Sequence, residues 1–374
     1  MDFYARKGGK RVYCQVIVDI VHENVASPFT YRIPEGMILE PGQRIEVPFG
    51  RIRKEGIVLS LASECELDPH RIRDVIRPLE DYAAIPQELM ELAEQMARDA
   101  HCPLAETLRL MLPAQMRGGR VKVRTERTAC LAVPAQTALE AAEKEKRSPK
   151  RARLLKLLAD GQVHTVKELS ASVREPNDAL KKLAADGLIR LEDEEALRTP
   201  GGRPEMTGDP GFRLTPGQEE ALDEILPCLK DPRKNGRFLL HGVTGSGKTE
   251  VFMAAVRKTL EFGKSAIILV PEIALTPQMV SWFRARFGPV AAVIHSRLSP
   301  GERFDEWRRI RRGDAKVVIG ARSAVFSPTR DLGLIVVDEE HENTYFSDHH
   351  PRYDAREIAM ARCTREHATL ILAS

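Results

Sequence analysis

The chain has 374 residues with a formal net charge of +3, and 43% of its residues are hydrophobic. This length predicts two or three domains with buried cores, and no apolar run reaches the ~20 residues that cross a bilayer. The near-neutral charge does not by itself indicate a nucleic-acid binder. The N-terminal segment lacks the apolar core of a signal peptide. We therefore expect a cytoplasmic protein with no membrane partner.

The first predicted domain, residues 1–115, begins with β-rich segments. Apolar and polar residues alternate from Val12 to Ile20, which is the period of a half-buried strand. Further strand-like runs follow at 29–33, 44–49 and 56–61, separated by turns that contain Pro and Gly. Short strands with tight turns favour an antiparallel sheet or a small barrel. Helical spacing then begins at Leu89 and continues through Leu110.

Residues 116–198 are predicted to form a basic linker and a winged-helix domain. We interpret 117–147 as a linker plus one strand, because this stretch is first basic and then Ala-rich. Three short helices are expected over 154–158, 165–169 and 176–185, followed by a first wing strand at 187–191. In related folds a later helix can enter a DNA groove. Here that helix mixes basic and acidic side chains, so DNA and protein partners both remain open.

The Pro/Gly-rich segment 199–212 is predicted to be a linker. From 213 to 374, continuous apolar strands alternate with amphipathic helices, which indicates a parallel sheet covered on both faces. The expected strands are 238–241, 266–270, 290–295, 316–319, 334–337 and 369–372. The expected helices lie at about 248–262, 275–287, 300–312 and 354–366.

The sequence Gly-Val-Thr-Gly-Ser-Gly-Lys-Thr at 242–249 follows an apolar strand and opens a helix, which is the context of a phosphate-binding loop. The loop residues expected to surround the phosphates are Gly242, Thr244, Gly245, Ser246 and Gly247. Lys248 should reach the β- and γ-phosphates, and the hydroxyl of Thr249 should hold Mg²⁺. The alternative is a Gly-rich corner that serves only the turn from strand to helix.

A second motif, Asp338-Glu339-Glu340-His341, ends the apolar strand at 334–337. Ligands of parallel α/β sheets bind at the carboxyl ends of the strands. Asp338 is therefore expected to complete the Mg²⁺ shell, mostly through water, and Glu339 to orient or deprotonate the attacking water. A solvated strand end is the alternative, but it does not explain why Lys248 accompanies these acids. ATP and Mg²⁺ are the expected cofactors.

The Asp-Glu-Glu-His sequence resembles the Asp-Glu-x-His box of superfamily 2 helicases and translocases, which adds His341 to the catalytic candidates. Other segments follow in the order of that superfamily. Residues 214–218 resemble its adenine-reading segment, with Gln218 hydrogen-bonding the base. Residues 270–276 and 319–326 resemble two of its DNA-contacting segments, which implies DNA contacts by Thr276 and Arg322.

Within that superfamily, residues 340–346 and 351–356 resemble the PriA (primosomal protein N-prime) family of bacterial replication-restart helicases. Residues 27–31 and 47–50 resemble that family's DNA-end-binding domain, so the resemblance covers essentially the whole chain. It implies a multidomain α/β fold with a small β-rich N-terminal DNA-binding domain, a winged helix and a RecA-like parallel α/β P-loop lobe.

The resemblance implies an ATP-dependent 3′-to-5′ DNA helicase. Such an enzyme recognises stalled or branched replication forks and initiates primosome assembly for replication restart. The implied partners are forked and single-stranded DNA, single-strand-binding protein and primosome proteins. Two alternatives stay open: a fork-remodelling superfamily 2 translocase, and a non-catalytic scaffold that binds fork DNA.

The resemblance also implies two sets of DNA-binding residues. The first falls in an aromatic-rich loop that senses single-stranded DNA and couples it to hydrolysis: Tyr345, Phe346, Arg352 and Tyr353. Aromatic faces stack on bases without reading sequence, although packing of a surface loop is the alternative. The second occupies positions of a pocket for a DNA 3′ end: Phe29, Thr30, Gly50 and Arg73. Some family members have Asp in place of Thr30, and Thr accepts a 3′-hydroxyl more weakly. Core packing is the alternative for Phe29.

The final residues, 369–374, resemble the start of the next helicase motif. The family's zinc-binding cysteine region, second motor lobe and C-terminal domain are therefore expected beyond this chain. The six cysteines accordingly include no C-x-x-C pair, and zinc is expected only in that missing part. Alone, this chain should bind branched DNA, bind ATP weakly, hydrolyse it slowly and unwind nothing.

Overall fold

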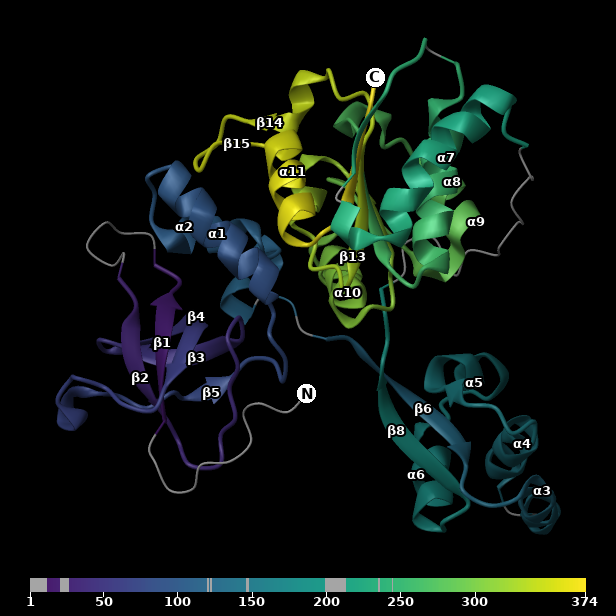
Figure 1. The fold of residues 1–374 in the computed structure, drawn as a ribbon. Coiled ribbons are helices and arrows are strands. Elements are labelled where there is room, and N and C mark those ends of the chain that lie inside the picture. The colour runs from purple at the N-terminus through teal and green to yellow at the C-terminus, as the bar shows by residue number, and fades with distance from the viewer. Residues whose placement is uncertain are drawn as a thin grey trace. The chain divides into compact units, whose positions relative to one another are not determined.

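The fold was analysed in a computed structural model, which describes residues 12–20, 27–119, 121, 123–145, 148–198, 213–234, 236–243 and 245–374. The chain divides into two compact units (Figure 1). Unit 1 comprises Met1–Val121 and Thr199–Ser374, and unit 2 comprises Lys122–Arg198. The predicted linker at 199–212 lies outside the described residues. Within the described residues, no helix is both long and apolar enough to span a bilayer.

The N-terminal part of unit 1 contains a five-stranded sheet in the order β2-β1-β4-β3-β5. Its strands are β1 (Val12–Val18), β2 (Phe29–Ile33), β3 (Arg44–Phe49), β4 (Ile52–Ala62) and β5 (Arg77–Pro78). All neighbouring strands pair antiparallel, as the alternation predicted. Gly42 has φ +82° before β3, and a Cβ there would lie 1.9 Å from the carbonyl oxygen of Ile85. Only glycine fits this close turn.

Two helices follow the sheet, α1 (Gln87–Asp99) and α2 (Leu104–Leu110). The apolar residues that predicted helical spacing, such as Leu89, Leu92 and Leu108, are buried in one apolar cluster. Thr107 is also buried, and its hydroxyl donates to the carbonyl oxygen of Ala93 at 2.8 Å. This bond satisfies a polar group where α2 packs on α1.

The C-terminal part of unit 1 is built on a parallel six-stranded sheet in the order β11-β12-β10-β13-β16-β9. The strands are β9 (Arg237–Leu240), β10 (Ser265–Leu269), β11 (Ala291–Ile294), β12 (Val317–Gly320), β13 (Leu332–Val337) and β16 (Thr369–Ala373). All six predicted strands are confirmed to within two residues at each end. This sheet, together with the antiparallel N-terminal sheet, confirms the multidomain α/β class.

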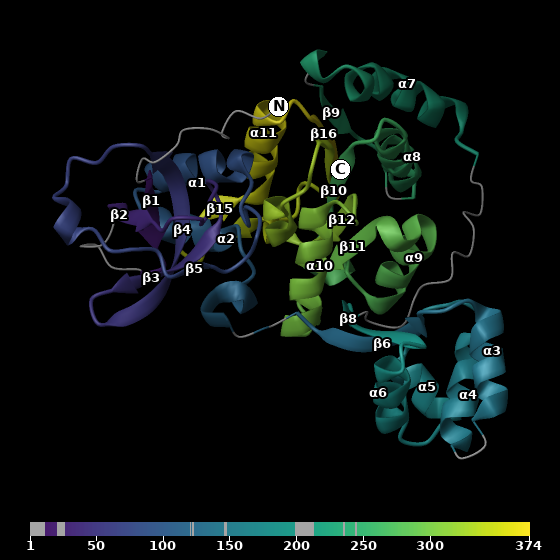
Figure 2. The same ribbon diagram turned by 90° about the horizontal axis from the view of Figure 1, so that it is seen from below.

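Helices cover both faces of the parallel sheet (Figures 1 and 2). One face packs against α7 (Pro216–Lys230), α8 (Lys248–Glu261) and α9 (Pro277–Phe287). The other packs against α10 (Pro300–Arg312) and α11 (Ala355–Arg365). Successive strand residues alternate between the two cores, as Ile267 and Ile268 do. Four of these helices match the predicted ranges, but α7 was not among the predicted helices.

Unit 2 contains a small antiparallel sheet in the order β7-β6-β8 and four helices. Its elements are β6 (Thr125–Leu131), α3 (Ala135–Lys144), α4 (Pro149–Leu158), β7 (His164–Thr165), α5 (Val166–Ser172), α6 (Asn177–Ala185) and β8 (Ile189–Glu195). The three helices predicted after residue 148 are confirmed. The prediction for 117–147 is corrected, because α3 is helical there and packs Ala138 and Ala142 into the core.

The wing strand of unit 2 also differs from its prediction. β8 begins at Ile189 and pairs along its whole length with β6, from Leu131↔Ile189 to Thr125↔Glu195. The partner of the wing strand is therefore β6, the one strand predicted within 117–147, and it precedes the helices in sequence. The strand exposes the acidic run 192–195, which does not favour contact with DNA phosphates.

Candidate functional site

The predicted phosphate-binding loop lies at the carboxyl end of β9 and leads into α8. Gly245 and Gly247 have φ +81° and +82°, the left-handed conformation that glycine adopts without strain. The Nζ of Lys248 donates to the carbonyl oxygen of Gly242 at 2.6 Å. The amide of Gly242 donates to the carbonyl oxygen of Ser374 at 3.0 Å, which ties the loop to the end of β16. Thr244 lies outside the described residues.

Gln218 lies in the first turn of α7 and contacts this loop. Its Oε1 accepts from the amide of Thr215 at 2.9 Å, as part of a capping box. Its Nε2 donates to the carbonyl oxygen of Ser246 at 2.9 Å. A Cβ on Gly247 would lie 2.3 Å from that nitrogen. Both ends of the amide predicted to read adenine are therefore engaged, Oε1 by the N-cap of α7 and Nε2 by the loop.

The acidic motif follows β13, two strands from β9 in the sheet. The amide of Asp338 donates to the carbonyl oxygen of Leu269 at 2.9 Å, and its Oδ1 accepts from the amide of Glu339 at 3.0 Å. Burial raises the pKa of Asp338, the charge of Glu339 adds to this effect, and the charge of Lys248 opposes it. Lys248 and Asp338 are thus electrostatically coupled at one edge of the sheet.

The remaining predicted catalytic groups lie at the same edge. The Nδ1 of His341 is 3.1 Å from the Oγ of Ser374, and its Nε2 is 3.7 Å from a carboxylate oxygen of Glu339. Thr249 follows Lys248 in the first turn of α8. The side chain of Glu339 is 42% exposed, so solvent reaches the carboxylate predicted to orient a water molecule. These residues come from three strand ends that parallel pairing places side by side.

Tyr345 requires a correction to its predicted direct contact with DNA. Its side chain is fully buried, so its ring offers no face to a base in this structure. Its hydroxyl donates to the carbonyl oxygen of Leu269 at 3.2 Å and also to that of Asp338. Burial raises the pKa of Tyr345, which keeps the hydroxyl protonated as a donor. Tyr345 therefore joins the ends of β10 and β13 beside the acidic motif.

Other residues of the aromatic-rich loop remain accessible. Phe346 is 47% exposed and Arg352 is exposed. Tyr353 is half-buried and packs edge-to-face on Phe326, with ring centroids 5.0 Å apart. Arg322 donates to the carbonyl oxygen of Phe346 at 2.7 Å, so the two predicted DNA segments are hydrogen-bonded to each other.

Two further residues position this region. Arg356, which was not among the predicted site residues, forms an ion pair with Asp354 and donates to the carbonyl oxygen of Glu340 at 2.7 Å. This second bond links the base of the loop to the acidic motif. Thr276 caps α9 by accepting from the amide of Met279 at 3.3 Å, and its exposed side chain lies just beyond the end of β10.

The residues predicted for the 3′-end pocket lie in or beside the N-terminal sheet, but Phe29 and Thr30 are consecutive on β2, so their side chains point to opposite faces. Arg73 is exposed and donates to the carbonyl oxygen of Gly50 at 2.6 Å. Phe29 packs edge-to-face on Phe49, with centroids 5.3 Å apart, so part of its surface serves the core. The hydroxyl of Thr30 accepts from Gln15 at 2.9 Å. A Cβ at Gly50, with φ +59°, would meet nothing within 4 Å, which leaves this turn open to a ligand.

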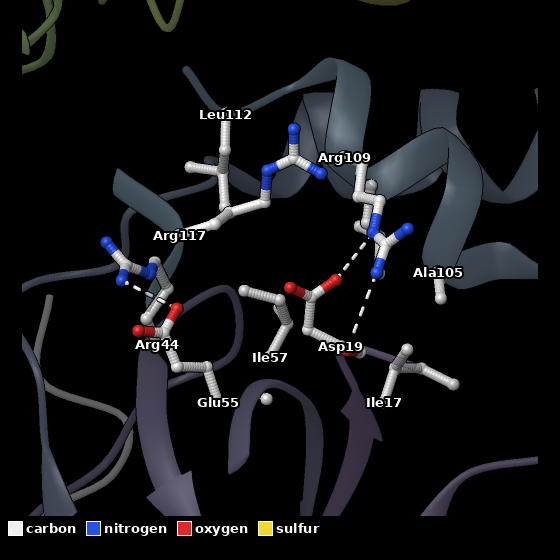
Figure 3. A pocket seen from close by; sticks show the side chains of 11 residues that line it. Ile17, Asp19, Arg44, Glu55, Ile57, Ala105, Arg109, Leu112 and Arg117 are labelled. Atoms are coloured by element: carbon white, nitrogen blue, oxygen red, sulfur yellow. Dashed lines mark hydrogen bonds and ion pairs between the residues drawn. The ribbon is translucent and has the colours of Figure 1, made fainter. Parts of the chain in front are cut away.

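A separate cavity of about 30 Å³ lies between the N-terminal sheet and α2 (Figure 3). Ion pairs flank it, with Arg109 Nε 2.6 Å from Asp19 and Arg44 3.0 Å from Glu55. The cavity includes none of the predicted site residues. Its volume suits a few water molecules rather than a nucleotide.

The comparisons with known proteins agree with this division of unit 1. Residues 15–113 match the 3'DNA-binding domain (3'BD) family model, and residues 215–374 match the DEAD/DEAH box helicase model. These matches define a helicase-type ATP-binding domain joined to a DNA-binding domain. Neither model match includes unit 2.

More specific matches are to replication restart proteins PriA. The chain is 32% identical to that of Bacillus subtilis over 97% of this chain and 53% of the relative. It is 32% identical to that of Chlamydia pneumoniae over 99% and 49% respectively. With that of Treponema pallidum it is 54% identical over 44% of this chain. The chain belongs to the PriA family, and it spans about half the length of the relatives that it matches over nearly its whole length.

Proposed function

We propose that this chain supplies the ATP-binding lobe and DNA-binding domains of an ATP-dependent 3′-to-5′ DNA helicase. The helicase would recognise stalled or branched forks and initiate primosome assembly for replication restart. The observation that carries the proposal is the position of the Tyr345 hydroxyl. It lies within hydrogen-bonding distance of two carbonyl oxygens, that of Leu269 at the end of β10 and that of Asp338. This bond gives a physical path from the segments proposed to bind DNA to the groups proposed to bind nucleotide.

The residues at the carboxyl ends of β9, β13 and β16 fit ATP and Mg²⁺. Lys248 would release the Gly242 carbonyl and contact the β- and γ-phosphates, while the loop amides surround them. Thr249 and Asp338 would hold Mg²⁺, which neutralises phosphate charge during transfer. A half-buried carboxylate with a raised pKa is a suitable cation ligand, because a divalent ion compensates its unfavourable burial. Glu339 would orient the attacking water, with His341 hydrogen-bonded to Ser374 beside it.

DNA would lie across the carboxyl ends of β10, β12 and β13. Thr276 follows β10, Arg322 follows β12, and Phe346 and Arg352 extend from the loop after β13. Exposed aromatic and arginine side chains bind single strands through stacking and charge. Phe29, Thr30, Gly50 and Arg73 would bind the DNA 3′ end in the N-terminal sheet.

The family implies further partners for the whole protein. We propose single-strand-binding protein and primosome proteins as partners, and the cytoplasm, where the replication fork lies, as its location. In unit 2, the acidic exposed run on β8 supports a protein partner over a DNA groove for the wing.

The proposal is tested by substituting Lys248 and measuring nucleotide and DNA binding separately. In the Lys248→Ala variant, we expect at least tenfold weaker binding of fluorescent Mg–ATP, because a charge-assisted phosphate contact is lost. Binding to a forked oligonucleotide without nucleotide should be unchanged. A wild-type chain that binds the fork but no nucleotide would support the scaffold alternative instead. A chain that binds neither would contradict the proposal.

A further inference from the structure

Three adjacent strands of the parallel sheet end in register. Strands β10, β12 and β11 are neighbours (Figure 2), and Leu269 of β10 pairs with Gly320 of β12, which pairs with Ile294 of β11. A Cβ at Gly320 would lie 2.8 Å from the carbonyl oxygen of Ile294, so glycine permits this close approach. The segments after β10 and β12 are already proposed to contact DNA. The segment after β11, which begins at His295, continues the same row but has no assigned role.

Positive charge gathers around this third strand end. The charges of Arg284 from α9, Arg297 from the loop and Arg303 from α10 all act on His295. Burial, followed by the charges of these three arginines, lowers the pKa of His295 and keeps its ring neutral at neutral pH. The nearby acid, Glu302, opposes this effect, but its carboxylate already accepts from the amide of Ser299 at 2.8 Å.

Polar atoms of this cluster are left without partners. Within the described part of the chain, His295 Nδ1 and Arg303 Nε are buried and make no hydrogen bond. Arg303 is held in place by donating through its Nη2 to the carbonyl oxygen of His295 at 3.1 Å. Arg297 is exposed, and among the same described residues it forms no hydrogen bond or ion pair. Arg303 Nε is thus a buried donor without a partner, and such a group carries a desolvation cost that a bound anion would offset.

We propose that Arg284, His295, Arg297 and Arg303 form a binding site for a phosphate of the DNA backbone. The site would extend the path of the DNA strand from the end of β12 to the end of β11, the outermost strand of the sheet. The inference rests on the proposed function, since it requires DNA to run across the carboxyl ends of these strands. Phosphate contacts of this kind fix the position of the strand and carry no sequence information.

The position of the cluster separates it from the nucleotide. In the strand order, β11 and β9 occupy opposite edges of the sheet, five strand spacings apart. At ~4.8 Å per spacing, the cluster lies ~24 Å from the phosphate-binding loop. It is therefore too distant to contact the phosphates of a nucleotide bound at Lys248, which leaves backbone phosphate as the anion that the fold brings to it.

The first test locates DNA on the wild-type chain. Arginine side chains would be modified with p-hydroxyphenylglyoxal with and without a saturating oligo-dT of about 30 nucleotides, and labelled sites mapped by mass spectrometry. We expect DNA to slow labelling of Arg297 at least threefold. Arg233 is the control. Its side chain is 90% exposed, and it lies before the amino end of β9, whereas Arg297 follows the carboxyl end of β11. Equal labelling of Arg297 at saturation would overturn the site, whereas the absence of saturable binding would instead contradict the proposed function.

The second test measures energetics. Arg297→Gln should weaken oligo-dT binding three- to tenfold. It should also reduce the slope of log Kd against log salt concentration by about 0.7, which is the value for one phosphate contact on a single strand. The loss should be equal for oligo-dT and a mixed sequence. Arg233→Gln should leave both quantities unchanged. If the two variants behave alike, Arg297 is a solvated charge and the site is refuted.

Discussion

The side chain of Tyr345 shows how one residue serves two parts of unit 1. An aromatic residue in a loop beside an acidic motif suggested stacking on DNA, yet the ring is buried and only the hydroxyl acts at the site. The accessible aromatic surface comes instead from Phe346, the next residue. We therefore propose base stacking for Phe346 and signal transmission for the neighbouring Tyr345.

The hydroxyl of Tyr345 can be removed without changing the ring. Tyr345→Phe should lower the free energy of unfolding by about 1 kcal/mol, since the Asp338 carbonyl loses its hydroxyl donor in the interior. It should also weaken the influence of oligo-dT on Mg–ATP affinity. Tyr13→Phe is the control, because it also removes the hydroxyl of a buried tyrosine but lies in the N-terminal sheet, outside the predicted site residues. Urea denaturation and nucleotide titration with and without oligo-dT measure both effects. Equal effects of the two variants would contradict the role of Tyr345.

Two buried thiols give a second prediction at the scale of single residues. Burial raises the pKa of both Cys14 and Cys363 from 9.0 to about 12. In the native chain, neither should react with iodoacetamide at pH 8.5, while the partly exposed Cys65 reacts. Between pH 9 and 12 the unfolded thiols lose protons that the folded ones retain, so the free energy of unfolding should fall as pH rises through this range. Rapid native labelling of Cys14 would show that the N-terminal sheet packs differently.

At the scale of elements, helix caps offer a controlled comparison in unit 2. Thr165 forms a capping box with Glu168 at the start of α5, whereas Ser148 precedes α4 and its side chain caps nothing. Thr165→Ala should destabilise unit 2 by about 1 kcal/mol, which corresponds to roughly fivefold faster exchange of its core amides. Ser148→Ala should have little effect. Hydrogen exchange of the amides of Leu155 and Leu180, measured in the whole chain, tests the difference. The opposite order of effects would refute the assignment of the caps.

Elements were predictable where local pattern and burial agree. The six strands of the parallel sheet are short apolar runs at regular spacing, and they were found within two residues. Helix α7 was missed because Pro227 lies within it and only Leu222, Ile225 and Leu229 are buried, so its sequence gives a weak helical pattern. Helix α3 was missed because its buried residues, Ala138 and Ala142, give only a weak apolar stripe.

Part of the candidate site was also predictable from the sequence. Lys248 and Asp338 were found from the types of residue at strand ends. The burial of Tyr345 and the role of Arg356 were not predictable, because both depend on carbonyl groups that only the folded sheet brings near. The cluster at His295 was also missed, since its arginines come from two helices and a loop.

At the scale of the whole molecule, unit 2 is an insertion between the two segments of unit 1. Replacing residues 122–198 with a short Gly/Ser linker should leave unit 1 folded, because Thr125 and Glu195 are register partners on neighbouring strands. Mg–ATP affinity should stay within about twofold of wild type, and one calorimetric transition should disappear. Loss of the unit 1 transition as well would show that the two units fold as one.

The same pairing of β6 and β8 has a mechanical consequence. The chain enters and leaves unit 2 at paired residues. A force pulling the two segments of unit 1 apart would therefore act first on the terminal residue pairs of β6 and β8. Antiparallel strands pulled from one end open one pair at a time. The unit would then act as a compliant element between the two segments of unit 1, and its helical core would carry no load until the strands have separated.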